Sequence, residues 1–222
     1  MKDQYQIDFE KYSLQKFFKS LRSRDMIPSR KILKDDLDNR FKILHENGIT
    51  NLKEIVEILK TKQKIEQFSK DTGLDMDYLI LLNREVKSYH PNPIRLDKFS
   101  GIEIENLDIL NAEGIKNTRH MINRAGTKKQ RIQLSETTGI PLKNLDELAG
   151  LSDLSRAYGV GPVFARMIYD IGIRTIKDFA AVSAEEFVQI YEEKTGKKAD
   201  FGAGEIQFSL DLAKELELIV EI

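Results

Sequence analysis

The paired glycines Gly159 and Gly161 lie between two apolar stretches that both have helical spacing. Two glycines allow a sharp turn, which leaves backbone N–H groups facing outward at the start of the next helix, where the helix dipole favours an anion. We therefore expect Gly159, Val160 and Gly161 to donate amides to a phosphate. Ala165 would lie at the helix start, and Arg166 would add positive charge. The alternative is a tight turn that only packs two helices.

A second kind of candidate anion site is basic. Lysines occupy the first turn of two predicted helices, directly after Thr61 and Thr127, where the helix dipole favours acidic residues. The unfilled N–H groups and two ammonium groups would bind a phosphate there. The candidate residues are Lys62, Lys64, Lys128 and Lys129, with Arg119, Arg124 and Arg131 close to the second pair. Solvated surface charge is the alternative.

The sequence offers no recognisable catalytic or metal-binding pattern. It contains no Cys, and its histidines, His45, His90 and His120, are isolated from one another and from carboxylates at ligand spacing. A P-loop, a dinucleotide fingerprint and a nucleophile elbow are also missing from the sequence. We expect no catalytic residue, no metal and no cofactor, so an enzyme is not expected.

Composition and charge favour a soluble, cytoplasmic protein. The lack of Cys is compatible with a reducing compartment, and we find no apolar run of the length of a signal peptide core or a membrane span, so no membrane partner is expected. The net charge of −1 gives no overall attraction to nucleic acid. Residues 1–34 carry nine Lys or Arg against four Asp or Glu, whereas residues 157–222 carry seven against twelve. A local basic surface is therefore compatible with the balance.

Three copies of one sequence unit span residues 40–74, 106–140 and 164–198. Each copy has a Gly-Ile pair and, about 25 residues later, a glycine preceded by Thr. These aligned glycines are Gly48, Gly114 and Gly172, and then Gly73, Gly139 and Gly196. Glycine just past an apolar-periodic run typically ends a helix in the left-handed conformation. Each copy therefore contains at least two helix ends at fixed positions.

Helix starts recur in the copies as well. Thr61, Thr127 and Ser183 precede new helical runs, and the pairs Thr127 with Gln130 and Ser183 with Glu186 predict capping boxes. The predicted fold class is all-α, with three divergent copies built from short helices.

The predicted parts of the chain follow from these copies and from two prolines. Residues 88–93 contain both prolines and predict a hinge or linker near residue 90, and residues 215–222 predict a packed tail without a clear choice between helix and strand. The parts are a helical extension at 1–34 that begins its helix at Ser13, a first repeat at 35–90, a second at 96–150, and a third with the intact hairpin at 151–222.

The hairpin sequence resembles the helix-hairpin-helix motif. That motif has an apolar residue, Gly, an apolar residue, Gly, and Ala a few places later, which here are Tyr158, Gly159, Val160, Gly161 and Ala165. Together with the earlier copies, the segment LAGLSDLSRAYGVGPVFARMIYDIGIRTIKDFA is similar to an uncharacterised bacterial and archaeal family of tandem helix-hairpin-helix repeats, known only as a domain of unknown function. The similarity covers roughly residues 30–215.

The resemblance implies a phosphate contact that does not read nucleic-acid sequence, commonly aided by a monovalent cation at the hairpin, here Gly159–Gly161. The other copies depart from the pattern. The second copy keeps Gly101 but has Glu103 at the second glycine position, and the first copy is acidic at residues 35–38. In the third copy, Val163 stands where phosphate-binding members often carry Lys.

Two functions follow from these patterns. The first is non-catalytic, sequence-independent binding of nucleic acid, DNA or RNA, through the backbone amides of the hairpin and the nearby cations. The second is a protein–protein interaction scaffold, in which degenerate repeats present helical faces to a protein partner. The acidic third copy and the shortage of aromatic residues for base stacking favour the second function.

Overall fold

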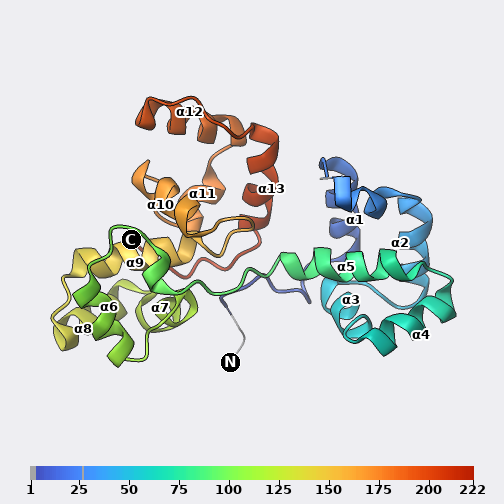
Figure 1. The fold of residues 1–222 in the computed structure, drawn as a ribbon, viewed down its shortest axis with the longest axis horizontal. Helices are drawn as coiled ribbons and strands as arrows, with labels where there is room; N and C mark the ends of the chain where they lie inside the picture. Colours follow the sequence, from blue (N-terminus) through green and yellow to red (C-terminus); the bar gives the residue numbers. More distant parts are fainter. Residues whose placement is uncertain (1–3, 27) are drawn as a thin grey trace. The chain divides into compact units, whose positions relative to one another are not determined.

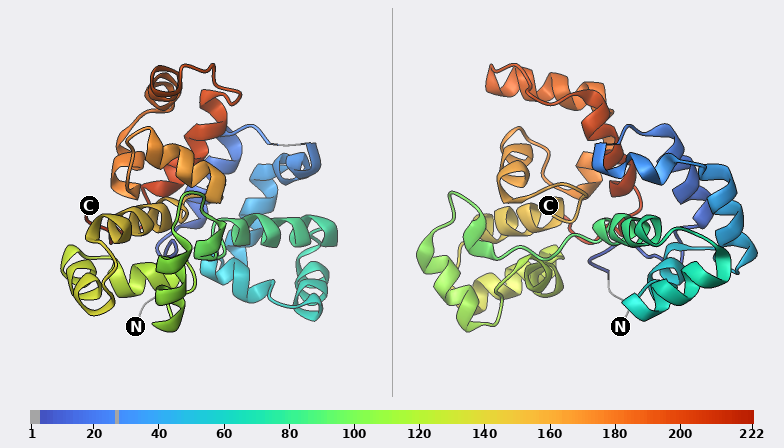
Figure 2. Two further views of the ribbon diagram at one scale, coloured as in Figure 1. Left: turned by 60° about the vertical axis from the view of Figure 1, so that its left-hand side comes forward. Right: turned by 45° about the vertical axis from the view of Figure 1, so that its right-hand side comes forward.

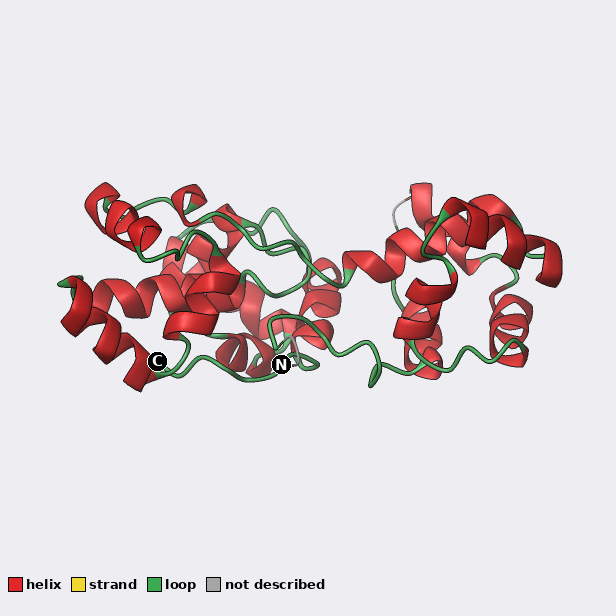
Figure 3. Cartoon of the chain, turned by 90° about the horizontal axis from the view of Figure 1, so that it is seen from below, coloured by secondary structure: helices red, strands yellow, loops and turns green. Residues whose placement is uncertain are grey.

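Helices and loops make up the part of the chain that the structure describes, residues 4–26 and 28–222 of a computed structural model. Figure 3 shows no strand in this part, although isolated antiparallel bridges join Ser13 to Asn51 and Arg95 to Asn117. The prediction of an all-α fold is confirmed. Within the described residues, none of the helices has both the length and the apolar character needed to cross a membrane.

The chain divides into two compact units. Unit 1 comprises Met1–Gln6 and Pro91–Ile222, and unit 2 comprises Ile7–His90. The division falls inside the proline-containing segment from which the hinge was predicted. Residues 7–34 lie in unit 2 together with the first sequence copy. The predicted boundaries at residues 34, 90 and 150 otherwise remain predictions.

Unit 2 is held together by an apolar core and one buried carboxylate. Ser13 caps its first helix by accepting the Lys16 amide, as predicted. The fully buried Glu85 receives hydrogen bonds from Arg24 and Arg30, so its charge is compensated inside the unit. The helices are α1 (Leu14–Ser23), η1 (Pro28–Lys34), α2 (Leu37–Glu46), α3 (Leu52–Ile58), α4 (Lys62–Thr72) and α5 (Met76–Ser88).

Unit 1 is built around α9, which packs against α7, α8, α10 and α11 (Figures 1 and 2). Leu145, Leu148, Leu151 and Leu154 on α9 are fully buried, and every residue from Leu148 to Leu154 is buried, so the second half of α9 is enclosed on all sides. The helices are η2 (Leu96–Lys98), α6 (Ile104–Ala112), α7 (Thr118–Ala125), α8 (Lys128–Thr138), α9 (Leu142–Leu154), α10 (Pro162–Asp170), α11 (Ile176–Ala181), α12 (Ala184–Thr195) and α13 (Ala203–Ala213).

The predicted helix ends recur at the predicted spacing. Gly73, Gly139 and Gly196 end α4, α8 and α12 with φ of 73°, 75° and 66°, in the left-handed region that favours glycine. The helices α4, α8 and α12 are capped by Thr61, Thr127 and Ser183, the residues before their first turns, and each cap side chain accepts an amide hydrogen bond. Both predicted capping boxes, at Thr127 and Ser183, are present.

The start of α11 differs from the starts of α3 and α7. The amides of Leu52 and Thr118 donate to the backbone carbonyls of Tyr12 and Ile94, at 3.1 and 2.8 Å. The corresponding Ile176 amide donates instead to the Asp153 carboxylate on α9, at 2.8 Å. In the third copy, the hydrogen-bond acceptor for this amide is therefore a side chain of α9, whereas in the other two copies it is a backbone carbonyl of a preceding segment.

Arg156 compensates the Asp153 charge and connects distant parts of unit 1. Its guanidinium donates to the Asp153 carboxylate, to the Tyr5 carbonyl at 3.0 Å, to the Gln4 carbonyl at 3.1 Å and to the Glu217 carbonyl at 2.8 Å. Burial raises the pKa of the Asp153 carboxyl, and the Arg156 charge opposes that rise. One buried side chain thus joins α9 to residues near both ends of the chain.

The C-terminal residues form a packed tail without helix or strand. Leu216 and Val220 are buried, and the Glu221 amide donates to the Gly126 carbonyl at 3.4 Å. The side chain of Arg131 donates to the Glu221 carbonyl. The tail approaches α9 closely at Gly150, where an added Cβ would lie 3.0 Å from Ile222 Cδ1.

Replacing Arg156 tests the importance of the buried ion pair. We expect Arg156→Met to lower the free energy of unfolding by about 3–5 kcal/mol, because Asp153 and three carbonyls lose their donor inside the unit. Arg124→Met, which removes an exposed arginine, should change it by less than about 0.5 kcal/mol. Urea unfolding followed by circular dichroism measures both, and hydrogen exchange assigns the loss to unit 1. Equal stability of the two variants would contradict the prediction.

Candidate nucleic-acid interface

The hairpin follows the end of α9, and its two glycines have different backbone requirements. Gly159 has φ of +75°, a conformation that residues with a Cβ rarely adopt. Gly161 has φ of −82° and ψ of 179°, which any residue adopts. Nothing lies within 4 Å of a Cβ added at either position. The positive φ therefore explains why residue 159 is a glycine. At residue 161, neither the backbone conformation nor close packing requires a glycine.

Several backbone N–H groups at the start of α10 have no intramolecular acceptor. In the described part of the chain, the amides of Gly159 and Gly161 make no hydrogen bond, and neither do those of Val163 and Phe164 in the first turn. Gly161 caps the helix without a side chain, and Pro162 follows it. The donors of Gly161, Val163 and Phe164 belong to the first turn of α10, whose positive end favours an anion.

Val160 and Ala165 have structural roles, which corrects part of the predicted site. The Val160 amide donates to the Ala157 carbonyl at 3.2 Å, and its side chain is buried. The Ala165 amide donates to the Gly161 carbonyl at 2.8 Å, and the residue is fully buried. Neither amide is open to a ligand, because the turn itself uses both.

Arg166 is also removed from the predicted site. Its Nη1 donates to Glu147 Oε1 on α9 at 2.5 Å, and only 15% of its side chain is exposed. Its Nε and Nη2 are covered by protein and have no partner among the described residues. The carboxylate neutralises the guanidinium, so Arg166 joins α10 to α9 and offers no charge to a ligand.

The hairpin is anchored on α13 by an aromatic pair and one hydrogen bond. The rings of Tyr158 and Phe208 meet edge to face, with centroids 4.9 Å apart. The Ser209 hydroxyl donates to the Tyr158 carbonyl at 2.6 Å. Val163, by contrast, is 82% exposed beside the open amides. The open face of the hairpin therefore carries one apolar side chain next to its donors.

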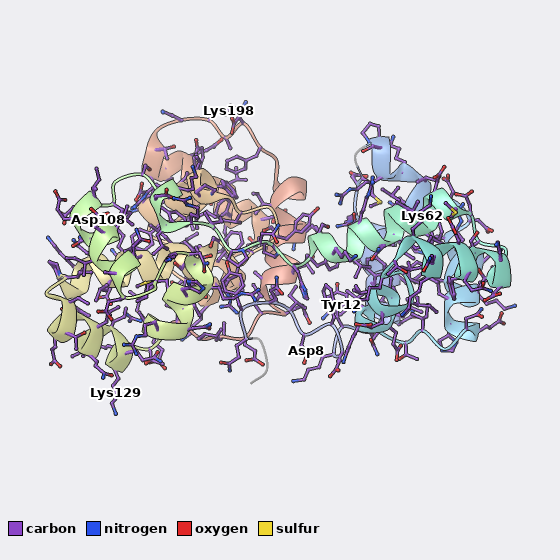
Figure 4. All side chains as sticks on the ribbon, turned by 60° about the horizontal axis from the view of Figure 1, so that its bottom comes forward. Asp8, Tyr12, Lys62, Asp108, Lys129 and Lys198 are labelled. Atoms are coloured by element: carbon purple, nitrogen blue, oxygen red, sulfur yellow. The ribbon has the colours of Figure 1, made fainter. Side chains whose placement is uncertain are left out.

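Two exposed lysines of unit 1, in a loop that contacts α10, were not among the predicted site residues. Lys197 and Lys198 are exposed in the loop between α12 and α13, and Figure 4 shows Lys198 pointing away from the protein. The loop borders the start of α10, because the ring of Phe201 lies 5.8 Å from the ring of Phe164. The only sequence signal was two lysines directly after a helix-ending glycine, far from the hairpin along the chain.

The basic residues around α8 divide into exposed and structural ones. Lys128, Lys129 and Arg124 are exposed. Arg131 is 1% exposed, with donors occupied by Asp146 at 2.5 Å and by carbonyls including that of Gly126 at 2.7 Å. Its predicted role in phosphate binding is therefore wrong, because no part of it reaches the surface.

The remaining basic candidates lie away from the hairpin. Arg119 is half-buried with its guanidinium carbon 5.0 Å from the centre of the Tyr5 ring. Figure 4 shows Lys129 and Lys198 on opposite sides of unit 1, so the start of α8 and the loop before α13 are separate surfaces. Lys62 and Lys64 belong to unit 2, where Lys62 lies 3.8 Å from Glu66 and Lys64 donates to the Glu57 carbonyl.

The helices that start the other two copies have an acid at the N-cap. Glu103 precedes α6 as Gly161 precedes α10, and its carboxylate accepts hydrogen bonds from Asn106 and Asn144, at 2.8 and 3.2 Å. Asp36 precedes α2 with φ of 47°. Neither acid caps its helix through its side chain, but each would repel a phosphate, so of these three helix starts α10 is the one without an acid at its N-cap.

The monovalent cation at Gly159–Gly161 stays a prediction. The carbonyls of Ala157, Tyr158 and Gly161 accept hydrogen bonds, whereas those of Gly159 and Val160 have no hydrogen-bond partner among the described residues. Two carbonyl oxygens of the hairpin are therefore left as the kind of ligand that a hard cation prefers. The described residues also contain no group of three or more His, Asp or Glu placed to hold a metal ion.

Comparison with known proteins gives one match. A family model described as a domain of unknown function (DUF4332) matches residues 100–200, which include the hairpin and the helices α6 to α12. No curated protein and no solved structure matches the chain. A domain of unknown function is therefore found in unit 1, and the match brings no activity with it.

The two glycines should respond differently to substitution. We expect Gly159→Ala to lower the free energy of unfolding by about 1 kcal/mol, because alanine is strained at φ of +75°. Gly161→Ser should raise it by about 0.5 kcal/mol, because serine adopts the observed φ, caps α10 and restricts the unfolded chain. Urea unfolding of both variants measures the difference. Equal losses would show that Gly161 is also needed for the fold.

Proposed function

We propose that this protein is a non-catalytic DNA-binding protein that contacts phosphates without reading sequence, through a hairpin of the helix-hairpin-helix type. The observation that carries the proposal is the set of open amides at Gly159, Gly161, Val163 and Phe164 at the start of α10. The loop–helix geometry and the spacing of the two glycines support the assignment of the hairpin type.

Binding through these groups would be independent of sequence. Backbone amides at a helix start contact phosphate oxygens, which are the same at every nucleotide. Lys197 and Lys198 would add charge from the neighbouring loop and release counterions from the nucleic acid. Because base edges are not contacted, the hairpin would bind either strand of a duplex, at any position along it.

The proposed interaction would be weak and salt-dependent. The chain has a net charge of −1, and the hairpin is supported by lysines and not by Arg166, so only a few phosphates would be neutralised. For two or three phosphate contacts, the affinity should fall roughly tenfold to fortyfold between about 50 and 200 mM salt.

A protein–protein scaffold is the second candidate function, and Val163 favours it. An apolar side chain that is 82% exposed beside unfilled donors also suits a protein surface, which offers both apolar groups and acceptors. A protein contact of this kind would keep most of its strength at higher salt.

An added carboxylate at the second glycine separates folding from binding. We expect Gly161→Asp to weaken binding of a short duplex at least about tenfold, because its charge faces the phosphate and its oxygen takes the open amides. The variant should unfold at the same or a higher urea concentration, because Asp is a favoured helix cap. Fluorescence anisotropy with a labelled duplex and a labelled single strand measures the affinity.

Asn111→Asp is the matched control for that experiment, since it adds the same charge at an exposed position on α6. Its affinity should stay within about twofold of the unchanged protein. If the unchanged protein binds neither oligonucleotide at about 50 mM salt, or binds with no salt dependence, the DNA-binding proposal fails and the scaffold is favoured.

Paired lysine replacements locate the charge that assists the hairpin. We expect Lys197→Gln with Lys198→Gln to reduce the slope of log affinity against log salt by about 2, because two phosphate contacts are lost. Lys128→Gln with Lys129→Gln removes the same charge from the start of α8 and should leave the slope unchanged. The reverse result would place the phosphate contact at α8. Salt titrations of both double variants provide the measurement.

A further inference from the structure

Three basic side chains surround one carboxylate in unit 2, where η1 packs against α1 and α5. The carboxylate belongs to Glu85 on α5, and its side chain is fully buried. Arg24 donates to one carboxylate oxygen and Arg30 to the other, so two guanidinium groups share a single negative charge. Lys34 at the end of η1 donates to the Arg24 carbonyl at 2.7 Å and pairs with no carboxylate among the described residues. We call these four residues the η1 cluster.

The η1 cluster keeps an excess of positive charge at a place that water reaches only in part. The exposed fraction of the side chain is 13% for Arg24 and 27% for Arg30, and Lys34 is half-buried. Charges in such places repel one another more strongly than on an open surface, because the effective dielectric constant is lower there. One carboxylate balances one of the three cations. An anion bound at the cluster would therefore relieve a repulsion that these four side chains leave in place.

The charged residues around the η1 cluster do not remove this excess. Its direct neighbours in sequence are two cations, Lys31 and Arg84, and two acids, Asp25 and Asp35, and all four are exposed. Their charges cancel in number, and water and salt screen exposed charges. Arg40 is a further half-buried cation, which donates to a carbonyl of η1 at 2.7 Å. The surroundings therefore add to the positive charge of the cluster.

Arg30 has donors left over for a ligand. Its Nη1 is taken by Glu85, whereas its Nε and Nη2 make no hydrogen bond with the described residues and are not enclosed by them. The bond to a buried carboxylate holds the guanidinium in one orientation, which lowers the entropy lost when a ligand binds. A guanidinium presents its N–H groups in a planar fork that matches two oxygens of a phosphate. Arg30 is therefore placed to contact an anion directly.

The size of the excess favours a phosphate as that anion. A phosphate monoester carries about −1.5 to −2 charges at pH 7 and has three acceptor oxygens, whereas a carboxylate carries one charge and two oxygens. Three cations against one carboxylate leave a deficit that a dianion fills and a carboxylate fills only in part.

We propose that the η1 cluster binds a phosphate group, with Arg30 in direct contact. The charges of Arg24 and Lys34 stabilise the bound phosphate from behind, and Glu85 keeps the two guanidinium groups in place. The site is independent of the hairpin, because all four residues belong to unit 2.

Inorganic phosphate is the first probe, titrated into the full chain at constant ionic strength. We expect saturable shifts of the backbone amide signals of η1 in NMR spectra, with a dissociation constant of about 1–10 mM. Arg30→Gln should weaken the binding at least about tenfold, because it removes both the fork and a charge. Lys70→Gln removes the same charge from an exposed position on α4 and is the matched control, which should bind phosphate as the unchanged protein does.

Folding does not limit this test. Glu85 keeps Arg24 as its partner when Arg30 is replaced, so the buried carboxylate is not left alone. Arg30→Gln should therefore unfold at the same urea concentration as the unchanged protein or at a higher one. Arg30→Lys keeps the charge without the fork, and its affinity for phosphate should lie between those of the unchanged protein and Arg30→Gln.

A second pair of probes identifies the source of the phosphate. A short duplex with 5′-phosphate ends and the same duplex with 5′-hydroxyl ends are compared by fluorescence anisotropy. A preference of at least about threefold for the phosphorylated duplex, lost in Arg30→Gln, assigns the site to the ends of nucleic acid. Equal affinities for the two duplexes, together with saturable binding of inorganic phosphate, assign it to a free phosphate compound.

Three results would overturn the proposal. They are the absence of a saturable shift up to about 50 mM phosphate, equal shifts with acetate at the same ionic strength, and equal affinity of Arg30→Gln and the unchanged protein for phosphate. None of these results bears on the hairpin, which Gly161→Asp tests separately.

Discussion

The buried ion pair between Asp153 and Arg156 determines where the hairpin begins. A carboxylate and a guanidinium that are almost fully covered are tolerated only when their hydrogen bonds are filled, because an isolated charge inside a protein is very unfavourable. Asp153 fills one bond by accepting the Ile176 amide at the start of α11. Arg156 fills the others with carbonyls near both chain ends. Gly159, the first residue of the hairpin, lies three residues after Arg156, so the hairpin follows a point that is held by several hydrogen bonds.

A fixed starting point matters because backbone amides bind a ligand only when they are already aligned. A flexible loop would lose conformational freedom on binding, which would reduce the affinity of a site with so few contacts. Here the Ser209 hydrogen bond and the Phe208 ring hold Tyr158, and the left-handed Gly159 turns the chain outward. Gly161 then places no charge beside the amides, whereas the N-caps of α2 and α6 carry a carboxylate. The fold needs Gly159 for its positive φ. Gly161 is not needed for the turn, and its lack of a side chain keeps the amides at the start of α10 accessible.

The sequence predicted the helix ends best, and it predicted least well which arginines are buried in ion pairs. Glycine after an apolar run and Ser or Thr before a new one are local signals, and Gly73, Gly139 and Ser183 act as predicted. A guanidinium lies at the end of a long side chain, and its partner is set by tertiary packing. Arg131 and Arg166 therefore looked like surface cations, although their partners, Asp146 and Glu147, are neighbours on α9.

Tertiary packing also brings the loop before α13 to the start of α10. The contact between Phe201 in that loop and Phe164 on α10 joins residues that are far apart in sequence, and no periodicity in the chain predicts it. The charge pattern along the sequence had pointed to residues 116–131, where the exposed lysines lie on another side of unit 1. Local signals thus predicted the open amides of Gly159 and Gly161 but not the use of the Val160 amide by the turn, and the position of charged side chains depends on contacts made in the folded unit.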